Sequence, residues 1–241
     1  MGGAQLAPLL TLLKPLTVAA YTAAGFWGGE TIYHLAARQA GAMPQAFAVR
    51  DRNRRLTYPE LVAAADRLAA HLAGHGIRPG NRVAVWLPSR VETAVALLAC
   101  SRNGYISCPS LHRNHTVGEV VALAERMRCS ALMAQPGYGA DADRCDVFAE
   151  LASREFVRCA WRVGLTDTAP FGELPGPVLD VEASCDANQV MYLPFTSGTT
   201  GQPSTVPRRR ERAALDRGAD RPALHPVDRR RKAERPLHRP R

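Results

Sequence analysis

Lysine is almost absent from this chain of 241 residues, which has only Lys14 and Lys232 against 29 Arg. The skew indicates a GC-rich coding sequence. The chain also lacks a C-x-x-C pair, and no histidine pair at zinc spacing lies near its cysteines, which argues against a structural zinc site. We therefore expect the thiols to be reduced and buried in a cytoplasmic protein. The six cysteines are Cys100, Cys108, Cys129, Cys145, Cys159 and Cys185.

The chain also lacks an uninterrupted apolar run that could cross a bilayer. Its apolar N-terminal stretch, residues 6–27, is broken by Lys14 and Pro15, and no basic side chain precedes it. Each apolar segment is too short for a membrane span, and the pattern does not fit a signal peptide. We expect no membrane span, and an amphipathic or partly buried helix in this region.

Charge is nearly balanced over most of the chain, although the formal net charge is +9. Residues 205–241 hold twelve Arg and one Lys against five acids, a balance of +8, which leaves +1 for residues 1–204. The same 37 residues contain no Phe, Trp or Tyr, so they cannot bury enough apolar surface to offset the entropy of ordering. We predict a folded domain over residues 1–204 and a disordered Arg/Pro-rich tail over residues 205–241.

Two explanations of the basic tail stay open. Arg-rich segments contact the phosphates of nucleic acids without sequence preference, so the tail could be a nucleic-acid arm. GC-rich DNA that is read out of frame also yields Arg, Pro, Ala and Gly. We favour a frameshift, because the composition changes abruptly at Ser204. A nucleic-acid partner is therefore not expected.

Three Ser/Thr-x-x-Glu patterns predict the starts of helices, because the two side chains of such a capping box satisfy free backbone N–H groups. They lie at Thr57–Glu60, Ser89–Glu92 and Thr116–Glu119, and apolar residues follow each at helical spacing. Apolar runs between and after these helices predict strands at residues 82–87, 105–108, 130–134, 155–161 and 189–193. The alternation predicts an α/β fold whose parallel strands are joined by crossover helices and covered on both faces.

The last predicted strand runs directly into Pro194–Ser204, which reads PFTSGTTGQPS. Glycines let backbone N–H groups converge and allow a ligand to approach closely, and successive N–H groups form a concavity that binds anions. The Ser and Thr hydroxyls add further donors. The stretch therefore predicts a polyphosphate-binding loop. It is not a Walker motif, since no lysine follows Gly201.

The stretch LPFTSGTTGQP at Leu193–Pro203 resembles the phosphate-loop signature of adenylate-forming (AMP-binding) enzymes. This superfamily includes acyl-CoA synthetases, coumarate-CoA ligases, luciferases and peptide-synthetase adenylation domains. Residues 56–61 (LTYPEL) and 76–89 (GIRPGNRVAVWLPS) are similar to its N-terminal segment. Residues 23–35 (AAGFWGGETIYHL) resemble the start of bacterial acyl-CoA ligases. The resemblance covers about residues 20–203 and implies the N-terminal part of the adenylate-forming fold.

The resemblance implies an ATP-dependent acid–thiol ligase acting on a carboxylic acid, such as a fatty-acid–CoA ligase of lipid metabolism. The carboxylate attacks the α-phosphate of ATP, which gives an acyl-adenylate and pyrophosphate, and coenzyme A then displaces AMP. ATP, Mg²⁺ and coenzyme A are the implied cofactors. No catalytic residue and no metal ligand is carried over. The implied contacts to the nucleotide triphosphate are Thr196, Ser197, Gly198, Thr199, Thr200 and Gly201.

The sequence departs from the family at Ser204, where the family usually has lysine. The family's acyl pocket, adenine- and ribose-binding motifs, Mg²⁺-ligating Glu and C-terminal adenylation Lys do not follow in residues 205–241. We therefore expect a truncated chain that forms no thioester by itself. The alternative is half of a split ligase, completed by another chain that carries the C-terminal part.

Several polar residues outside the loop are weaker candidates. His112, His115 and three aspartates at residues 141, 143 and 146 fall in predicted loops, where we expect solvated side chains and no metal site. His71 and His75 lie four residues apart on a predicted helix without an H-E-x-x-H pattern. We expect both of these histidines to be surface residues.

Overall fold

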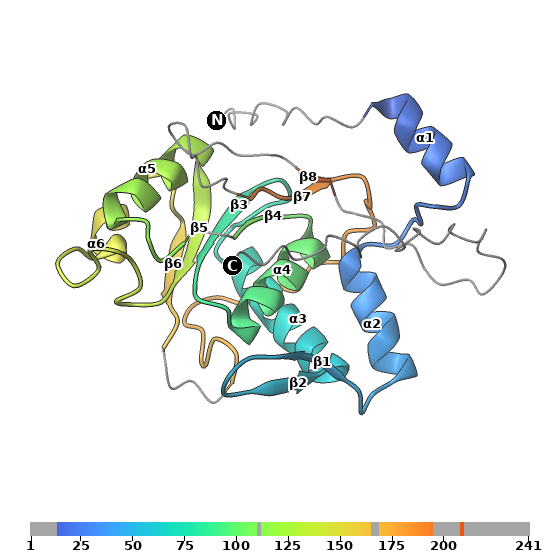
Figure 1. The fold of residues 1–241 in the computed structure, drawn as a ribbon, viewed down its shortest axis with the longest axis horizontal. Coiled ribbons are helices and arrows are strands. Elements are labelled where there is room, and N and C mark those ends of the chain that lie inside the picture. Colours follow the sequence, from blue (N-terminus) through green and yellow to red (C-terminus); the bar gives the residue numbers. More distant parts are fainter. Residues whose placement is uncertain (1–13, 110–111, 165–168, 195–207, 210–241) are drawn as a thin grey trace, which may run out of the picture.

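The computed structural model describes residues 14–109, 112–164, 169–194 and 208–209 (Figure 1). The helices in these ranges are α1 (Pro15–Ala23), α2 (Ile32–Ala42), α3 (Tyr58–Gly74), α4 (Val91–Asn103), α5 (Val117–Met127) and α6 (Val147–Ala152). The strands are β1 (Phe47–Arg50), β2 (Arg55–Thr57), β3 (Arg82–Trp86), β4 (Ile106–Cys108), β5 (Cys129–Ala134), β6 (Cys159–Arg162), β7 (Val190–Tyr192) and β8 (Arg208–Arg209).

The main sheet has six strands in the order β6-β5-β3-β4-β7-β8. The pairs from β6 through β7 are all parallel, and only β8 pairs antiparallel, along β7. β1 and β2 form a separate antiparallel hairpin. The predicted α/β class with a parallel sheet and crossover helices is confirmed.

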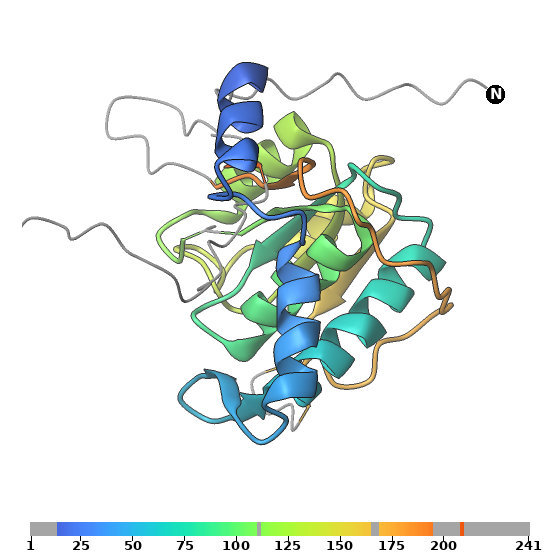
Figure 2. The same cartoon turned by 90° about the vertical axis from the view of Figure 1, so that its right-hand side faces the viewer.

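Helices cover both faces of this sheet, as Figures 1 and 2 show. On one face α3 and α4 pack against alternate strand residues such as Val83 and Val85, and α2 packs against these helices. On the other face α5 and α6 pack against Ala84 and Trp86. All five residues of β3 are buried, which explains why the strand reads as a continuous apolar run.

The connection from β6 to β7 crosses the face that α3 and α4 cover. The Leu179 amide donates to the Ala70 carbonyl of α3 at 3.0 Å. Arg102 of α4 donates to the Val181 carbonyl at 2.7 Å and pairs with Asp180 at 3.0 Å. These contacts bring the chain back to the far side of β4, where β7 is added.

Two of the three predicted capping boxes are confirmed. Thr57 and Thr116 each accept a bond from the backbone N–H of the glutamate three residues on, and each glutamate bonds back to the cap N–H. The third prediction is wrong about the capping residue. α4 forms, but its N-cap is Arg90, whose side chain makes no capping hydrogen bond. β6 also begins later than predicted, because the Val157 amide closes a turn onto the Arg154 carbonyl at 3.0 Å.

Two expectations about burial are corrected. Four of the cysteines are buried, but Cys145 and Cys185 are exposed, and none forms a disulfide. The predicted N-terminal helix is present as α1, yet it buries no residue. No helix of the described ranges is long and apolar enough to cross a bilayer.

Candidate functional site

The six predicted phosphate contacts, Thr196, Ser197, Gly198, Thr199, Thr200 and Gly201, lie outside the described residues. The structure describes the chain up to Pro194, directly before them. The candidate site is therefore built from what surrounds the carboxyl end of β7, where the loop begins.

β7 lies in the sheet through a short parallel contact with β4. Ser107 is paired with Tyr192, and the Leu193 amide donates to the Ser107 carbonyl at 2.9 Å. Met191 and Leu193 are 5% and 2% exposed, so their side chains are part of the core. Because β3 to β7 are parallel, the chain leaves β7 at the edge of the sheet where the other parallel strands also end.

The amino end of β7 is fixed by Gln189. Its Nε2 donates to the Gly104 carbonyl at 2.8 Å, and the Gly80 amide donates to the same oxygen at 2.8 Å. Gly104 ends α4 with a φ of 72°, and a Cβ at this position would lie 2.7 Å from Gln189 Oε1. Only glycine fits this turn without strain, so the turn after α4 and the start of β7 are held together.

The carboxyl edge is also where the topology of the sheet reverses. The chain after β3 enters α4 on one face, whereas the chain after β4 enters α5 on the other face. The two connections therefore diverge above the adjacent ends of β3 and β4. Open α/β sheets bind their ligands in such a crevice at the carboxyl ends of the strands.

Trp86 and His115 build part of this edge. Trp86 Nε1 donates to the His112 carbonyl at 3.2 Å, and the two imidazoles of His112 and His115 stack with centroids 5.9 Å apart. The His115 carbonyl accepts the Ala140 amide at 2.9 Å, which joins the loops after β4 and β5. The side chain of His115 is only 12% exposed, and its Nε2 has no hydrogen-bond partner within the described residues. The expectation of a solvated His115 is therefore wrong.

A pocket of about 220 Å³ opens beside this edge, at the ends of β5 and β6. Aromatic rings of Trp86, Tyr138 and Phe148 contribute to its walls, and Arg162 and Asp146 contribute charge. Arg162 donates to Asp146 at 2.7 Å and lies 4.2 Å above the Phe148 ring. The bond from Arg162 lowers the pKa of the Asp146 carboxyl more than its burial raises it.

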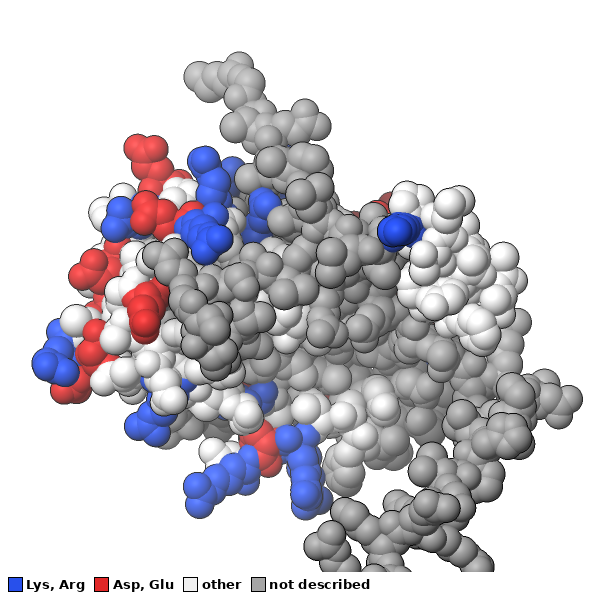
Figure 3. Space-filling model, turned by 45° about the horizontal axis from the view of Figure 1, so that its top comes forward, with Lys and Arg blue, Asp and Glu red and all other residues white. Residues whose placement is uncertain are grey.

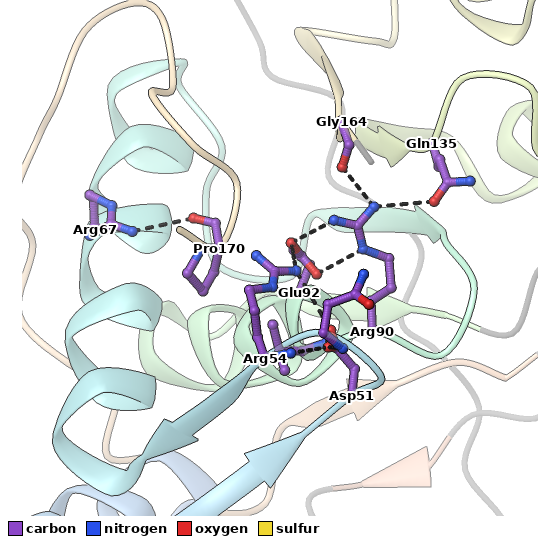
Figure 4. A network of polar contacts seen from close by, with 10 residues as sticks. Asp51, Arg54, Arg67, Arg90, Glu92, Gln135, Gly164 and Pro170 are labelled. Carbon is purple, nitrogen blue, oxygen red and sulfur yellow. Dashed lines mark hydrogen bonds and ion pairs between the residues drawn. The ribbon is translucent and has the colours of Figure 1, made fainter. Parts of the chain in front are cut away.

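A buried charge network that no local sequence pattern predicts lies on the same edge (Figure 4). Glu92 of α4 has a side chain that is 0% exposed, and it is ion-paired to Arg54 and Arg90. Arg90 Nη1 also donates to Gln135 Oε1 at 3.1 Å and to the Gly164 carbonyl at 2.7 Å. One carboxylate therefore holds the turn of the β1–β2 hairpin, the start of α4 and the ends of β5 and β6.

Asp51 supplies the cap that Ser89 was expected to give. Its Oδ2 accepts the Val91 amide at 3.0 Å, and its Oδ1 accepts the Asn53 and Arg54 amides at 2.8 Å each. Burial opposes ionisation of this carboxyl, but the backbone bonds, first that from Val91, outweigh it and lower its pKa. The cap lies 40 residues from the helix that it caps, beyond the reach of a local pattern.

His71 is buried, which corrects the expectation of a surface residue. Its burial lowers the pKa of the imidazole, and nearby His75 and Arg67 lower it further. No group of three or more His, Cys, Asp or Glu within the described residues is arranged to hold a metal ion.

Residues 36–217 match the family of AMP-binding enzymes. The chain is 33% identical over 209 residues to a salicyl-AMP ligase / salicyl-S-ArCP synthetase of Mycobacterium tuberculosis, covering 79% of this chain and 35% of that protein. It is 31% identical over 212 residues to a 2-hydroxy-7-methoxy-5-methyl-1-naphthoate–CoA ligase of Streptomyces carzinostaticus, covering 79% and 36%. The chain thus spans about a third of the length of these curated relatives.

Solved structures show the same relationship. The apo structure of Mycobacterium smegmatis MbtA is similar with a TM-score of 0.64 and 33% identity, over 83% of this chain and 37% of that chain. A putative long-chain-fatty-acid CoA ligase of Rhodopseudomonas palustris is similar with a TM-score of 0.59 at 22% identity, over 75% of this chain and 44% of that chain. The second likeness shows the fold alone.

Proposed function

The chain belongs to the AMP-binding enzyme family of adenylate-forming ligases, and from this premise we propose that it carries the triphosphate-binding part of such a ligase. In this proposal the backbone N–H groups and hydroxyls of Thr196–Gly201 receive the β- and γ-phosphates of ATP. Donors that are fixed around a polyphosphate stabilise the charge that develops on departing pyrophosphate.

One observation carries this proposal: the strand that feeds the loop ends at the carboxyl edge of the parallel sheet. β7 pairs with β4 through Ser107 and Tyr192, beside the crevice where the connections after β3 and β4 diverge. Nucleotide phosphates bind at this edge in open α/β sheets. Gln189 and the buried side chain of Leu193 support the position of β7 from both ends.

The proposed reaction is the one that the family performs. A substrate carboxylate attacks the α-phosphate of ATP, the bond to the β-phosphate breaks, and an acyl-adenylate and pyrophosphate form. A thiol then displaces AMP to give a thioester. The thiol is coenzyme A, or that of a carrier protein as in the name of the mycobacterial relative.

For the acid substrate we propose an aromatic carboxylate. The two curated relatives described above are named for salicylate and a hydroxynaphthoate. A fatty acid, the narrower expectation from the sequence, is the competing proposal. The named fatty-acid ligase among the similar structures shares only 22% identity with the chain, and this likeness supports the fold alone.

The family implies Mg²⁺ together with ATP. The ion would offset the charge of the triphosphate during pyrophosphate departure. Within the described residues no cluster of three carboxylate, imidazole or thiol groups could hold it alone. We propose that the phosphates supply most of its ligands, with the hydroxyls of Thr199 and Thr200 beside them.

Three further points remain proposals. We keep the division into a domain over residues 1–204 and a basic segment over residues 205–241, although the family match runs to residue 217. A second chain that supplies the rest of the fold would complete the ligase. We also propose a cytoplasmic location, because the cytoplasm contains both ATP and coenzyme A.

Binding of triphosphate by the full chain tests this function. We expect MgATP to bind in equilibrium dialysis and inorganic tripolyphosphate to compete with it, because the loop holds phosphates. Gly198→Val places a side chain where the phosphates approach and should lower affinity at least about tenfold. The matched control Ser153→Ala removes a hydroxyl at the end of α6 and should leave affinity unchanged.

Absence of competition by tripolyphosphate, or equal affinity of both variants, would contradict the proposal. An assay of AMP release with ATP, coenzyme A and acids adds a second check. We expect no thioester from the chain alone, and robust turnover would overturn that expectation. In an assembled enzyme, ATP–pyrophosphate exchange that responds to dodecanoate and not to salicylate would favour the fatty-acid alternative.

A further inference from the structure

The segment formed by residues 14–29, here called the N-terminal arm, stands off the body of the protein at α1 (Figures 1 and 2). None of its residues is buried. Leu16 is 84% exposed, Phe26 is 62% exposed and Tyr21 is 45% exposed. These three are among the most exposed large apolar side chains of the described residues.

The composition of the N-terminal arm is that of a buried element. α1 itself has no charged residue, and Lys14 is the only charge in the N-terminal arm. A helix that is apolar on all sides is normally enclosed by protein or lipid. In Figure 3 the region of α1, at the right of the view, is mostly uncharged, whereas acidic and basic side chains gather at the left.

The aromatic residues of the N-terminal arm form a fixed cluster. The ring of Tyr21 lies edge-on to Phe26 at 6.1 Å and to Trp27 at 5.0 Å. The amides of Phe26 and Trp27 both donate to the Tyr21 carbonyl, at 3.0 and 3.2 Å. Aromatic residues without charges are the signature of the buried centre of a protein interface.

We propose that the N-terminal arm is a docking surface for the remainder of the adenylate-forming fold, supplied by the same polypeptide or by a second one. This inference rests on the proposed function. The matched part is 83% of this chain but only 37% of the MbtA chain, so most of an MbtA-like fold lies outside the part that this chain supplies. The exposed apolar side chains of the N-terminal arm form a surface that this remaining part of the fold can cover.

A lipid surface fits the N-terminal arm less well. α1 has nine residues, which corresponds to about 14 Å of helix, whereas a bilayer core is about 30 Å thick. Helices that lie in the membrane interface carry several basic residues on a polar face, and the N-terminal arm offers only Lys14. Protein is therefore the proposed occupant, and lipid is an outcome that the test must separate.

Thiol labelling measures whether the N-terminal arm becomes covered. Phe26→Cys introduces a thiol in the aromatic cluster of the N-terminal arm, and Val178→Cys introduces one at an equally exposed position, 62% in both residues, on the connection from β6 to β7. Maleimide labelling of the full chain, followed by peptide mapping, gives the rate at each thiol. Natural Cys145 and Cys185 are exposed and serve as internal references.

Each variant is compared in three states: the full chain alone, the full chain mixed with the part of M. smegmatis MbtA that this chain does not match, and a fusion of residues 1–203 to that part. We expect labelling at Phe26→Cys to slow at least about tenfold in the fusion, with Val178→Cys unchanged. The same slowing in the mixture would show that a separate polypeptide can supply the partner.

Equal rates at Phe26→Cys in the full chain and in the fusion would overturn the inference. So would slowing at both positions, slowing that depends on the concentration of the full chain alone, or slowing only with phosphatidylcholine/phosphatidylglycerol vesicles. Labelling does not depend on ATP. A protected N-terminal arm in a fusion that fails to bind tripolyphosphate would therefore disprove the proposed function and leave the docking surface standing.

Discussion

The starts of α3 and α5 differ from the start of α4 in the origin of the groups that cap them. Thr57 and Thr116 cap their own helices within one turn of chain. The start of α4 is capped by Asp51 from the β1–β2 hairpin and is surrounded by the Glu92 network. α3 and α5 therefore begin on local signals, whereas the start of α4 requires the assembled domain.

The difference matters because of where α4 begins. α4 follows β3 at the carboxyl edge, beside the crevice that we assign to the nucleotide. Arg90 connects this start to the ends of β5 and β6 through Gln135 and Gly164. A helix start that depends on three other segments of chain also holds those segments in place around the candidate site.

Removal of Glu92 should have the largest effect. Glu92→Ala leaves Arg54 and Arg90 buried without their common carboxylate, and we expect a loss of about 3–5 kcal/mol in the free energy of unfolding. Urea unfolding measures it. Glu30→Ala is the control, since its pair with Arg38 is 38% and 44% exposed and should cost less than about 1 kcal/mol. Similar losses in the free energy of unfolding for the two variants would contradict the expected difference between buried and exposed ion pairs.

Loss of the remote cap should come next. Asp51→Ala removes the acceptor of the Val91, Asn53 and Arg54 amides, and we expect a loss of about 2 kcal/mol. Hydrogen exchange should accelerate in the first turn of α4 and not in the first turn of α5. Asp143→Ala, at an exposed ion pair, is the control. Unchanged exchange at Val91 would show that Asp51 does not cap α4.

The local caps should have smaller and independent effects. Thr57→Ala and Thr116→Ala should each cost about 1 kcal/mol, because each loses one capping box. α3 and α5 pack on opposite faces of the sheet, so the double variant should lose the sum of the two. Asp51→Ala and Glu92→Ala, which share Arg54, should not add. Calorimetry of the four single variants and the two double variants distinguishes these cases. Strictly additive stability losses for Asp51→Ala and Glu92→Ala would contradict a shared network.

The smallest effect concerns the other end of α3, where His71 is buried. Burial lowers its pKa in the folded protein, so the unfolded chain takes up a proton first as the pH falls. Stability supported by the neutral imidazole is present above the ordinary histidine pKa of about 6.5 and declines as the pH falls below that value. His71→Gln should flatten this decline in urea unfolding. A decline of equal slope in the variant would assign the pH dependence to other groups.

Much of the fold was predictable because its signals are local. The capping boxes at Thr57 and Thr116 and the apolar runs that became β3, β4, β5 and β7 all act within a few residues. The family resemblance, based mainly on Leu193–Pro203, is confirmed by the match over residues 36–217. The phosphate contacts themselves stay a prediction, since residues 195–207 lie outside the described ranges.

The features that sequence reasoning missed depend on contacts between distant residues. Asp51 and Val91 are 40 residues apart, and Arg90 and Gly164 are 74 apart. Ser89 has the spacing of a capping residue, but the carboxylate of Asp51 caps the helix instead. The burial of His71 and the low exposure of the His115 side chain likewise follow from which helices and loops pack around them. A single sequence does not contain that information in a local pattern.

Hydrogen exchange across residues 190–203 of the full chain is the most direct test of the central claim, that the strand next to β4 delivers a triphosphate-binding loop to the carboxyl edge. With Mg²⁺ and inorganic tripolyphosphate we expect slower exchange in this segment, and no such change with adenosine alone. Exchange that is unaltered at saturating tripolyphosphate, or that slows only elsewhere in the chain, would contradict the account.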